Sequence, residues 1–149
     1  MTDTNPIDCP YYLISRVALV VTSALKRGFA DAGVNAVKPA YLGVLLTLWR
    51  EDGLKVIDLG RKSGLEPSTM TGLLDRMERD ALLYREADPS DRRAQRIYLT
   101  ATGRKVKTPV LQAVDKVLAE VFKGIDEKEL RNTKNTLQRV LTNAQEGNR

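Results

Sequence analysis

Three arginines lie close together after a turn-forming run, and their positive charge suits them to bind an anion. The run is Asp88-Pro89-Ser90-Asp91, and the next five residues contain Arg92, Arg93 and Arg96. Strand-like segments at 82–86 and 96–100 flank the run, which predicts a hairpin with a charged tip. A guanidinium there can enter a narrow A·T-rich minor groove, where negative potential is enhanced, and we assign this role to Arg93. The competing interpretation is that these arginines only solvate a loop.

A second set of polar side chains lies on a short helix predicted to begin at Pro67. Its inner face is apolar, with Met70, Leu73, Leu74 and Met77, and its outer face carries Ser68, Thr69, Thr71, Asp75 and Arg76. Arg76 can contact guanine or phosphate, and the hydroxyls can reach phosphates or base edges. The alternative is a solvated helix face on which Asp75 and Arg79 pair four residues apart.

A preceding short helix, expected over residues 55–63, ends at Gly64. Two short helices joined by about four residues that include a glycine are typical of a helix-turn-helix. Basic residues near these helix ends are candidates for contacts with phosphates: Lys55, Arg61 and Lys62. The alternative for each is that it lies on the solvent-facing side of an amphipathic helix and contacts no phosphate.

Composition excludes several classes of function. The 149 residues include no histidine and one cysteine, Cys9, so histidine-based catalysis, ordinary zinc sites and an internal disulfide are excluded. No phosphate-binding glycine loop, metal-ligand cluster or nucleophile motif occurs, so we expect no enzyme, no metal and no cofactor. No apolar run approaches the roughly 20 residues of a membrane span, and we expect a cytoplasmic protein. The net charge of +5 is too small to identify a partner.

The spacing of apolar residues predicts helices in the remaining segments. An N-terminal helix beginning at Tyr11 is apolar on more than one side, which suggests that a second subunit covers part of it. A central helix begins near Pro39, and two long helices end the chain. We expect a kink or an interrupted start near Pro109, and a capping pair formed by Asp126 and Glu129. A helix-turn-helix followed by a hairpin is a winged helix, so the predicted fold is mainly α with a small β-hairpin.

Residues 65–103 read LEPSTMTGLLDRMERDALLYREADPSDRRAQRIYLTATG, and this segment resembles the MarR family of bacterial transcription regulators. The shared features are a small polar opening, a Leu-x-Asp-Arg-Met-Glu core, a wing of the form Asp-x-x-Asp-x-Arg, and Leu-Thr-x-x-Gly. Three positions depart from the family pattern: Glu66 at the helix entry, Gly72 in place of a longer polar residue, and Ala81 in place of glycine. Alanine in the left-handed turn expected at 81 costs roughly 1 kcal/mol.

The resemblance implies a single domain over 1–149, with a winged-helix lobe at 36–100 and dimerisation helices at 8–33 and 101–146. It implies a homodimer that binds palindromic double-stranded promoter DNA in a sequence-specific manner, most often as a repressor, and that binds no membrane. It also implies a local salt bridge from Asp91 that positions Arg93. Many family members release DNA when a small phenolic or lipophilic acid binds, or when a cysteine is oxidised.

The family's effector pocket lies between the dimer helices and the winged lobe. Candidate lining residues here are Tyr11, Tyr12, Arg16, Tyr41 and Trp49, although Tyr41 and Trp49 fit a core role better. Cys9 is a candidate redox switch, but no Lys or Arg lies close to it in sequence. Two alternatives to a ligand-released repressor therefore stay open. One is a regulator that senses oxidation through Cys9, and the other is a winged helix used only for protein–protein contact.

Overall fold

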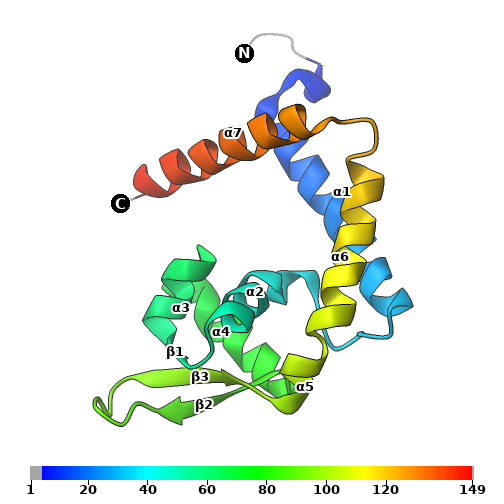
Figure 1. Ribbon diagram of the computed structural model, residues 1–149. Helices are drawn as coiled ribbons and strands as arrows, with labels where there is room; N and C mark the ends of the chain where they lie inside the picture. The colour runs from blue at the N-terminus through cyan, green and yellow to red at the C-terminus, as the bar shows by residue number, and fades with distance from the viewer. Residues whose placement is uncertain (1–4, 149) are drawn as a thin grey trace. The chain divides into compact units, whose positions relative to one another are not determined.

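The computed structural model describes residues 5–148 (Figure 1). The chain divides into two compact units, the first ending at Val117 and the second beginning at Leu118. The first unit opens with the 3-10 helix η1 (Pro6–Asp8) and α1 (Pro10–Asp31), in which proline takes the first helical position. It continues through η2 (Pro39–Tyr41), α2 (Leu42–Arg50), β1 (Leu54–Lys55), α3 (Val56–Ser63) and α4 (Pro67–Arg79). It then forms β2 (Leu83–Ala87), β3 (Gln95–Leu99), α5 (Ala101–Lys105) and most of α6 (Lys107–Val121).

The core of the first unit lies between α2, α3, α4 and the sheet. It is formed by side chains with at most 8% exposure, among them Leu45, Leu48, Leu59, Met70, Leu74, Met77, Leu83 and Ile97. The inner face predicted for the helix at Pro67 is therefore confirmed. Phe29 of α1 and Val110 of α6 belong to the same cluster. The predicted fold class, mainly α with a winged helix-turn-helix, is confirmed.

The sheet has three antiparallel strands in the order β1-β3-β2. The prediction of a two-stranded hairpin missed β1, in which Leu54 pairs with Ile97, because two residues are too few to show an alternating pattern. The hairpin itself is confirmed, with Arg85 opposite Ile97 and Glu86 opposite Arg96. Its strands begin and end one residue away from the expected positions, which is the usual uncertainty of a boundary.

The predicted interruption near Pro109 is present, since α5 ends at Lys105 and α6 begins at Lys107. Pro109 falls in the first turn of α6, where its missing N–H leaves no hydrogen bond unmade. The second unit contains the end of α6 and α7 (Glu127–Glu146). The predicted capping pair is confirmed, because Asp126 accepts from the backbone of Glu129 and the Glu129 side chain accepts from the backbone of Asp126.

Within residues 5–148 no helix combines the length and apolar character needed to cross a membrane.

Candidate nucleic-acid interface

The helix-turn-helix is formed by α3, a turn at Gly64 and α4. Gly64 has φ 71°, the left-handed conformation that ends a helix at little cost in glycine. Pro67 then starts α4, and the five outer residues predicted from the sequence are all exposed on it: Ser68, Thr69, Thr71, Asp75 and Arg76. The Thr71 hydroxyl donates to the carbonyl oxygen of Pro67 at 3.3 Å. All five side chains are therefore accessible to solvent on the second helix.

Asp75 does not pair with Arg79, the partner that the simple helix-face interpretation proposed. Its Oδ1 instead accepts from Nη2 of Arg85 on β2 at 2.7 Å. Nη1 of the same guanidinium lies 3.4 Å from Oε2 of Glu78. Sequence reasoning missed Arg85, because its contact depends on the register of β2 beneath α4 and not on helical spacing.

The base of the wing is held by a buried carboxylate, Asp88, whose side chain is 1% exposed. Asp88 accepts from the backbone N–H groups of Ser90 at 2.8 Å and Asp91 at 3.0 Å, and from Nε of Arg96 at 2.6 Å. Arg96 also donates from Nη1 to the carbonyl oxygen of Gly53 at 2.8 Å. The backbone hydrogen bonds, led by that of Ser90, together with Arg96, hold the pKa of Asp88 below its ordinary value. Arg96 therefore anchors the wing to the lobe, a role that the sequence did not suggest.

The tip of the wing carries Arg92 and Arg93, both exposed. Asp91 Oδ1 accepts from the backbone N–H of Arg93 at 3.0 Å. The predicted salt bridge between the Asp91 carboxylate and the Arg93 guanidinium is thus replaced by a hydrogen bond to the backbone, and across residues 5–148 no ion pair of Arg93 is found. Asp91 consequently fixes the chain at Arg93 and leaves its guanidinium to solvent.

The basic residues near the helix ends differ in their surroundings. Lys55 is half-buried at the start of α3 and has no ion pair within the described part of the chain. Arg61 lies 3.7 Å from Asp58, one turn earlier on α3. Lys62 pairs with Glu51, which follows α2. Of these three candidates for phosphate contact, Lys55 alone makes no ion pair among residues 5–148.

The aromatic candidates for an effector pocket separate into two groups. Tyr41 is 1% exposed and donates from its hydroxyl to Oδ2 of Asp80 at 2.6 Å, while Lys38 lies 3.4 Å from the same oxygen. Burial, followed by the hydrogen bond to Asp80, raises the pKa of Tyr41 to about 12, and the same bond lowers the pKa of Asp80. Trp49 donates from Nε1 to the carbonyl oxygen of Gly103 at 2.9 Å. Tyr41 therefore belongs to the core and the partly buried Trp49 packs against it, as their alternative interpretation held.

The other candidates lie on or next to α1. Tyr11, Tyr12 and Arg16 are exposed on the first turns of that helix. Cys9 precedes the helix at its N-cap position, is partly exposed, and makes no side-chain capping hydrogen bond. Within the described residues no group of three or more acidic or cysteine side chains could hold a metal ion.

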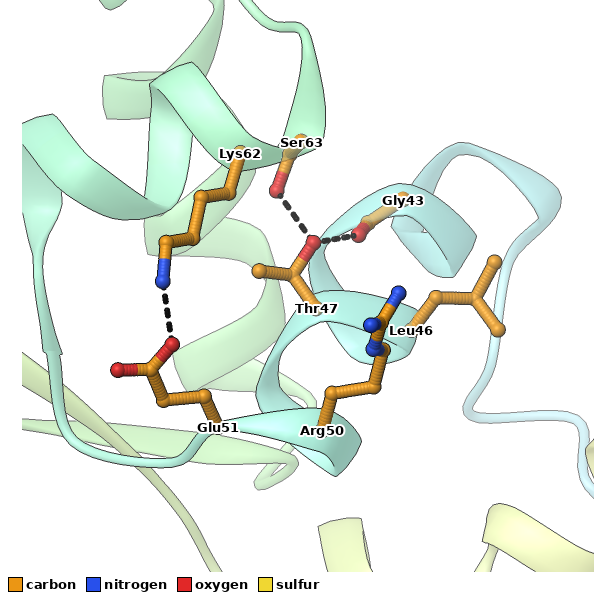
Figure 2. Close-up of a pocket in the computed structure, with 7 residues that line it drawn as sticks. All are labelled: Gly43, Leu46, Thr47, Arg50, Glu51, Lys62 and Ser63. Carbon is orange, nitrogen blue, oxygen red and sulfur yellow. Dashed lines mark hydrogen bonds and ion pairs between the residues drawn. The ribbon is translucent and has the colours of Figure 1, made fainter.

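A groove of about 550 Å³ lies between α2 and the end of α3 (Figure 2). Its lining residues are Gly43, Leu46, Thr47, Arg50, Glu51, Lys62 and Ser63. The sequence did not indicate a pocket here, and of these residues it had singled out only Lys62, as a candidate for phosphate contact. The hydroxyls of Thr47 and Ser63 lie 3.0 Å apart, and Thr47 donates to the carbonyl oxygen of Gly43. Lys62 is paired with Glu51, so the guanidinium of Arg50, which extends back along α2, supplies the net charge of the groove.

Comparison with known proteins agrees with this geometry. A model of the MarR family matches residues 39–94, which include the helix-turn-helix and most of the wing. The organic hydroperoxide resistance transcriptional regulator of Bacillus subtilis (strain 168) is 32% identical over 109 residues, covering 72% of this chain and 74% of that protein. The chain belongs to the MarR family. The family consists of transcription regulators rather than enzymes, as the sequence predicted.

Two further comparisons bear on the MarR-family assignment. The HTH-type transcriptional regulator TtmR of Methylorubrum extorquens (strain PA1) is 44% identical over 69 residues, which cover 46% of this chain and 35% of that protein. This chain therefore spans about a third of the length of TtmR. The crystal structure of the PcaV transcriptional regulator from Streptomyces coelicolor, in complex with its natural ligand, superposes with a TM-score of 0.83. At 22% identity, over 97% of this chain and 99% of that one, it shows that the fold is shared.

Proposed function

We propose that this chain is a sequence-specific DNA-binding transcription regulator that acts as a homodimer on palindromic promoter DNA, most simply as a repressor. The observation that carries the proposal is the wing tip. Asp91 fixes the backbone of Arg93 while its guanidinium faces solvent, next to a helix-turn-helix whose outer side is polar. With Arg93 held in place beside an exposed α4, the wing can reach the minor groove of a DNA duplex while α4 reaches the major groove.

The test is the affinity for the chain's own upstream DNA across a salt series, beside a shuffled duplex of equal length. We expect a strong preference for the native fragment and an affinity that falls steeply with salt, by about 0.9 log units per log unit of salt for each phosphate neutralised. Arg93→Ala should weaken specific binding by about 1–3 kcal/mol. Arg27→Ala, which removes an exposed arginine of α1, serves as the control for lost charge.

Equal, weak binding to both duplexes would contradict the proposal. The absence of salt-dependent DNA binding would favour the alternative, a winged helix used for protein–protein contact. The solvent-facing arginines of the wing tip argue against that alternative, because burying an unpaired guanidinium in a protein interface is costly.

A homodimer is supported by α1, whose apolar side chains are exposed along most of its length. Leu13, Val17, Leu19 and Val20 are 43%, 55%, 58% and 54% exposed. Exposed apolar side chains in this number on one helix of a charged chain are typical of a protein interface. On α7, described by itself, Leu137, Val140 and Leu141 are similarly exposed.

For ligand release we propose the groove between α2 and α3, with a small carboxylic acid as the ligand. Arg50 supplies a cation that has no ion pair within residues 5–148, Ser63 a hydroxyl, and Leu46, 42% exposed, an apolar wall. We expect a panel of aromatic and aliphatic acids to include members that raise the melting temperature, and Arg50→Ala to abolish that shift. Arg16→Ala is the matched control, and a shift lost only with Arg16 would place the ligand at α1 instead. Absence of any shift would contradict ligand release.

Oxidation sensing through Cys9 is the competing proposal for regulation. Its support is the name of the Bacillus subtilis relative, an organic hydroperoxide resistance regulator, and the partial exposure of Cys9. Against it, Lys and Arg are absent from the immediate neighbourhood of Cys9 in sequence, and a thiolate needs such support. DNA affinity that mild peroxide leaves unaltered would contradict this proposal.

A further inference from the structure

Arg85 connects the two elements that we propose to meet DNA. It lies in the middle of β2, on the face that also carries the buried Leu83, and opposite the buried Ile97 of β3. Its side chain is only 21% exposed. A guanidinium on the inward face of a strand needs partners, and α4 supplies them.

The partners are two carboxylates three residues apart on α4. Nη2 of Arg85 donates to Oδ1 of Asp75 at 2.7 Å, and Nη1 lies 3.4 Å from Oε2 of Glu78. Residues three apart lie on the same side of a helix, so one planar guanidinium can reach both. Each partner is itself about half exposed, 56% for Asp75 and 44% for Glu78, so neither is forced into this position by burial.

The consequence is electrostatic. Among residues 67–79, α4 carries two acids, Asp75 and Glu78, and two bases, Arg76 and Arg79. Both acids contact Arg85 of β2, whose single positive charge offsets part of theirs, whereas no ion pair involves Arg76 or Arg79 within residues 5–148. Arg85 therefore lowers the negative charge that α4 presents, while Arg76 and Arg79 stay exposed. Phosphates approaching α4 would meet less repulsion from carboxylates than they would without Arg85.

We propose that Arg85 is a positioning residue for DNA binding, which ties Asp75 and Glu78 to β2 and offsets part of their negative charge. The inference rests on the proposed DNA-binding function. It gives Asp75 a role other than base contact. It also makes β2, which leads directly into the wing at Asp88, the strand from which both DNA-contacting elements are positioned.

The experiment measures affinity for the upstream DNA at fixed salt in three variants of the full chain. Arg85→Ala frees both carboxylates, and we expect affinity to fall about tenfold. Arg85→Ala with Asp75→Asn has the net charge of the natural chain and lacks one freed carboxylate, and we expect affinity to return to within about threefold. Arg85→Ala with Asp115→Asn has the same net charge, but Asp115 lies on α6, so affinity should stay low. Circular dichroism and a melting curve check that each variant is folded.

Any other outcome would contradict either the proposed function or this inference. If the natural chain binds no DNA, the proposed function fails, and this inference fails with it. If the natural chain binds and folded Arg85→Ala binds equally, the inference alone fails. If Asp75→Asn restores nothing, the loss does not come from the freed Asp75 carboxylate, and the inference fails. If Asp115→Asn restores as much as Asp75→Asn, net charge explains the effect and the local pairing has no role.

Discussion

Ala81 illustrates at the scale of one residue how a fold can retain local strain. It follows α4 with φ 59°, a left-handed conformation in which a Cβ atom is crowded by the backbone. The hydrogen bonds from Ala81 N–H to Glu78 and from Leu82 N–H to Met77 require that turn, and Leu82 is fully buried just after it. The strain persists because the buried neighbour fixes the path of the chain.

Ala81→Gly should therefore stabilise the protein. Glycine removes roughly 1 kcal/mol of strain and loses part of this to the greater entropy of its unfolded chain, so we expect the free energy of unfolding to rise by about 0.5 kcal/mol. Ala119→Gly, at an exposed position inside α6 with ordinary helical geometry, should lower it by about 0.5–1 kcal/mol. Urea unfolding at one protein concentration measures both. Equal effects of the two substitutions would show that the turn carries no strain.

The same residue shows what the sequence could predict. The left-handed turn at Ala81 followed from its place in a family motif, and the outer residues of α4 followed from helical spacing. Arg85, Asp88 and the second role of Arg96 did not follow, because their partners lie across strands or far along the chain. The sequence correctly predicted that Asp91 contacts Arg93, but it predicted the guanidinium as the partner. The observed partner is the backbone N–H of Arg93, since a short polar side chain can readily accept a hydrogen bond from the neighbouring backbone.

At the scale of elements, the end of α4 is tied to the start of α2. Asp80, the C-cap residue of α4, accepts from the Tyr41 hydroxyl at 2.6 Å, and Lys38 approaches the same carboxylate from outside. The sequence predicted both helices but not this tie, because Tyr41 and Asp80 are 39 residues apart. The register of a helix against another depends on packing, which a single sequence does not encode as a local pattern.

Tyr41→Phe tests this tie. The loss of the hydrogen bond to Asp80 should lower the free energy of unfolding by about 1 kcal/mol at pH 8. The pKa of Tyr41 is raised to about 12 in the folded protein, from about 10 when unfolded. Its contribution is therefore complete below pH 10 and is lost as pH rises towards 12. The difference between the natural chain and Tyr41→Phe should be smaller at pH 11 than at pH 8. Tyr84→Phe, on the exposed face of β2, is the control for removing a tyrosine hydroxyl and should cost less stability at pH 8.

At the scale of the whole molecule, apolar surface and charge are distributed unequally. The winged helix buries its apolar residues in one core and exposes hydroxyls and arginines. Helix α1 does the reverse, since of its residues only Phe29 is buried while Val17, Leu19 and Val20 are more than half exposed. The amphipathic pattern of the sequence already indicated a second surface on this helix. We propose that a second copy of the chain covers it, which would also bring two winged helices to the two halves of a palindrome.

Val17→Glu should test that assembly. A carboxylate at the centre of the exposed apolar face would have to be desolvated in a dimer, so we expect the variant to shift from dimer to monomer in light scattering at micromolar concentration. Ile57→Glu is the matched control, because Ile57 is 66% exposed but lies on α3, in the winged helix. It should leave the oligomeric state unchanged. A dimeric Val17→Glu would mean that α1 does not form the interface. A dimer binds both half-sites with a single loss of translational freedom, so it should bind a palindromic fragment more tightly than a monomer does. If the Val17→Glu variant were monomeric and kept full affinity for that fragment, the two half-sites would be bound independently.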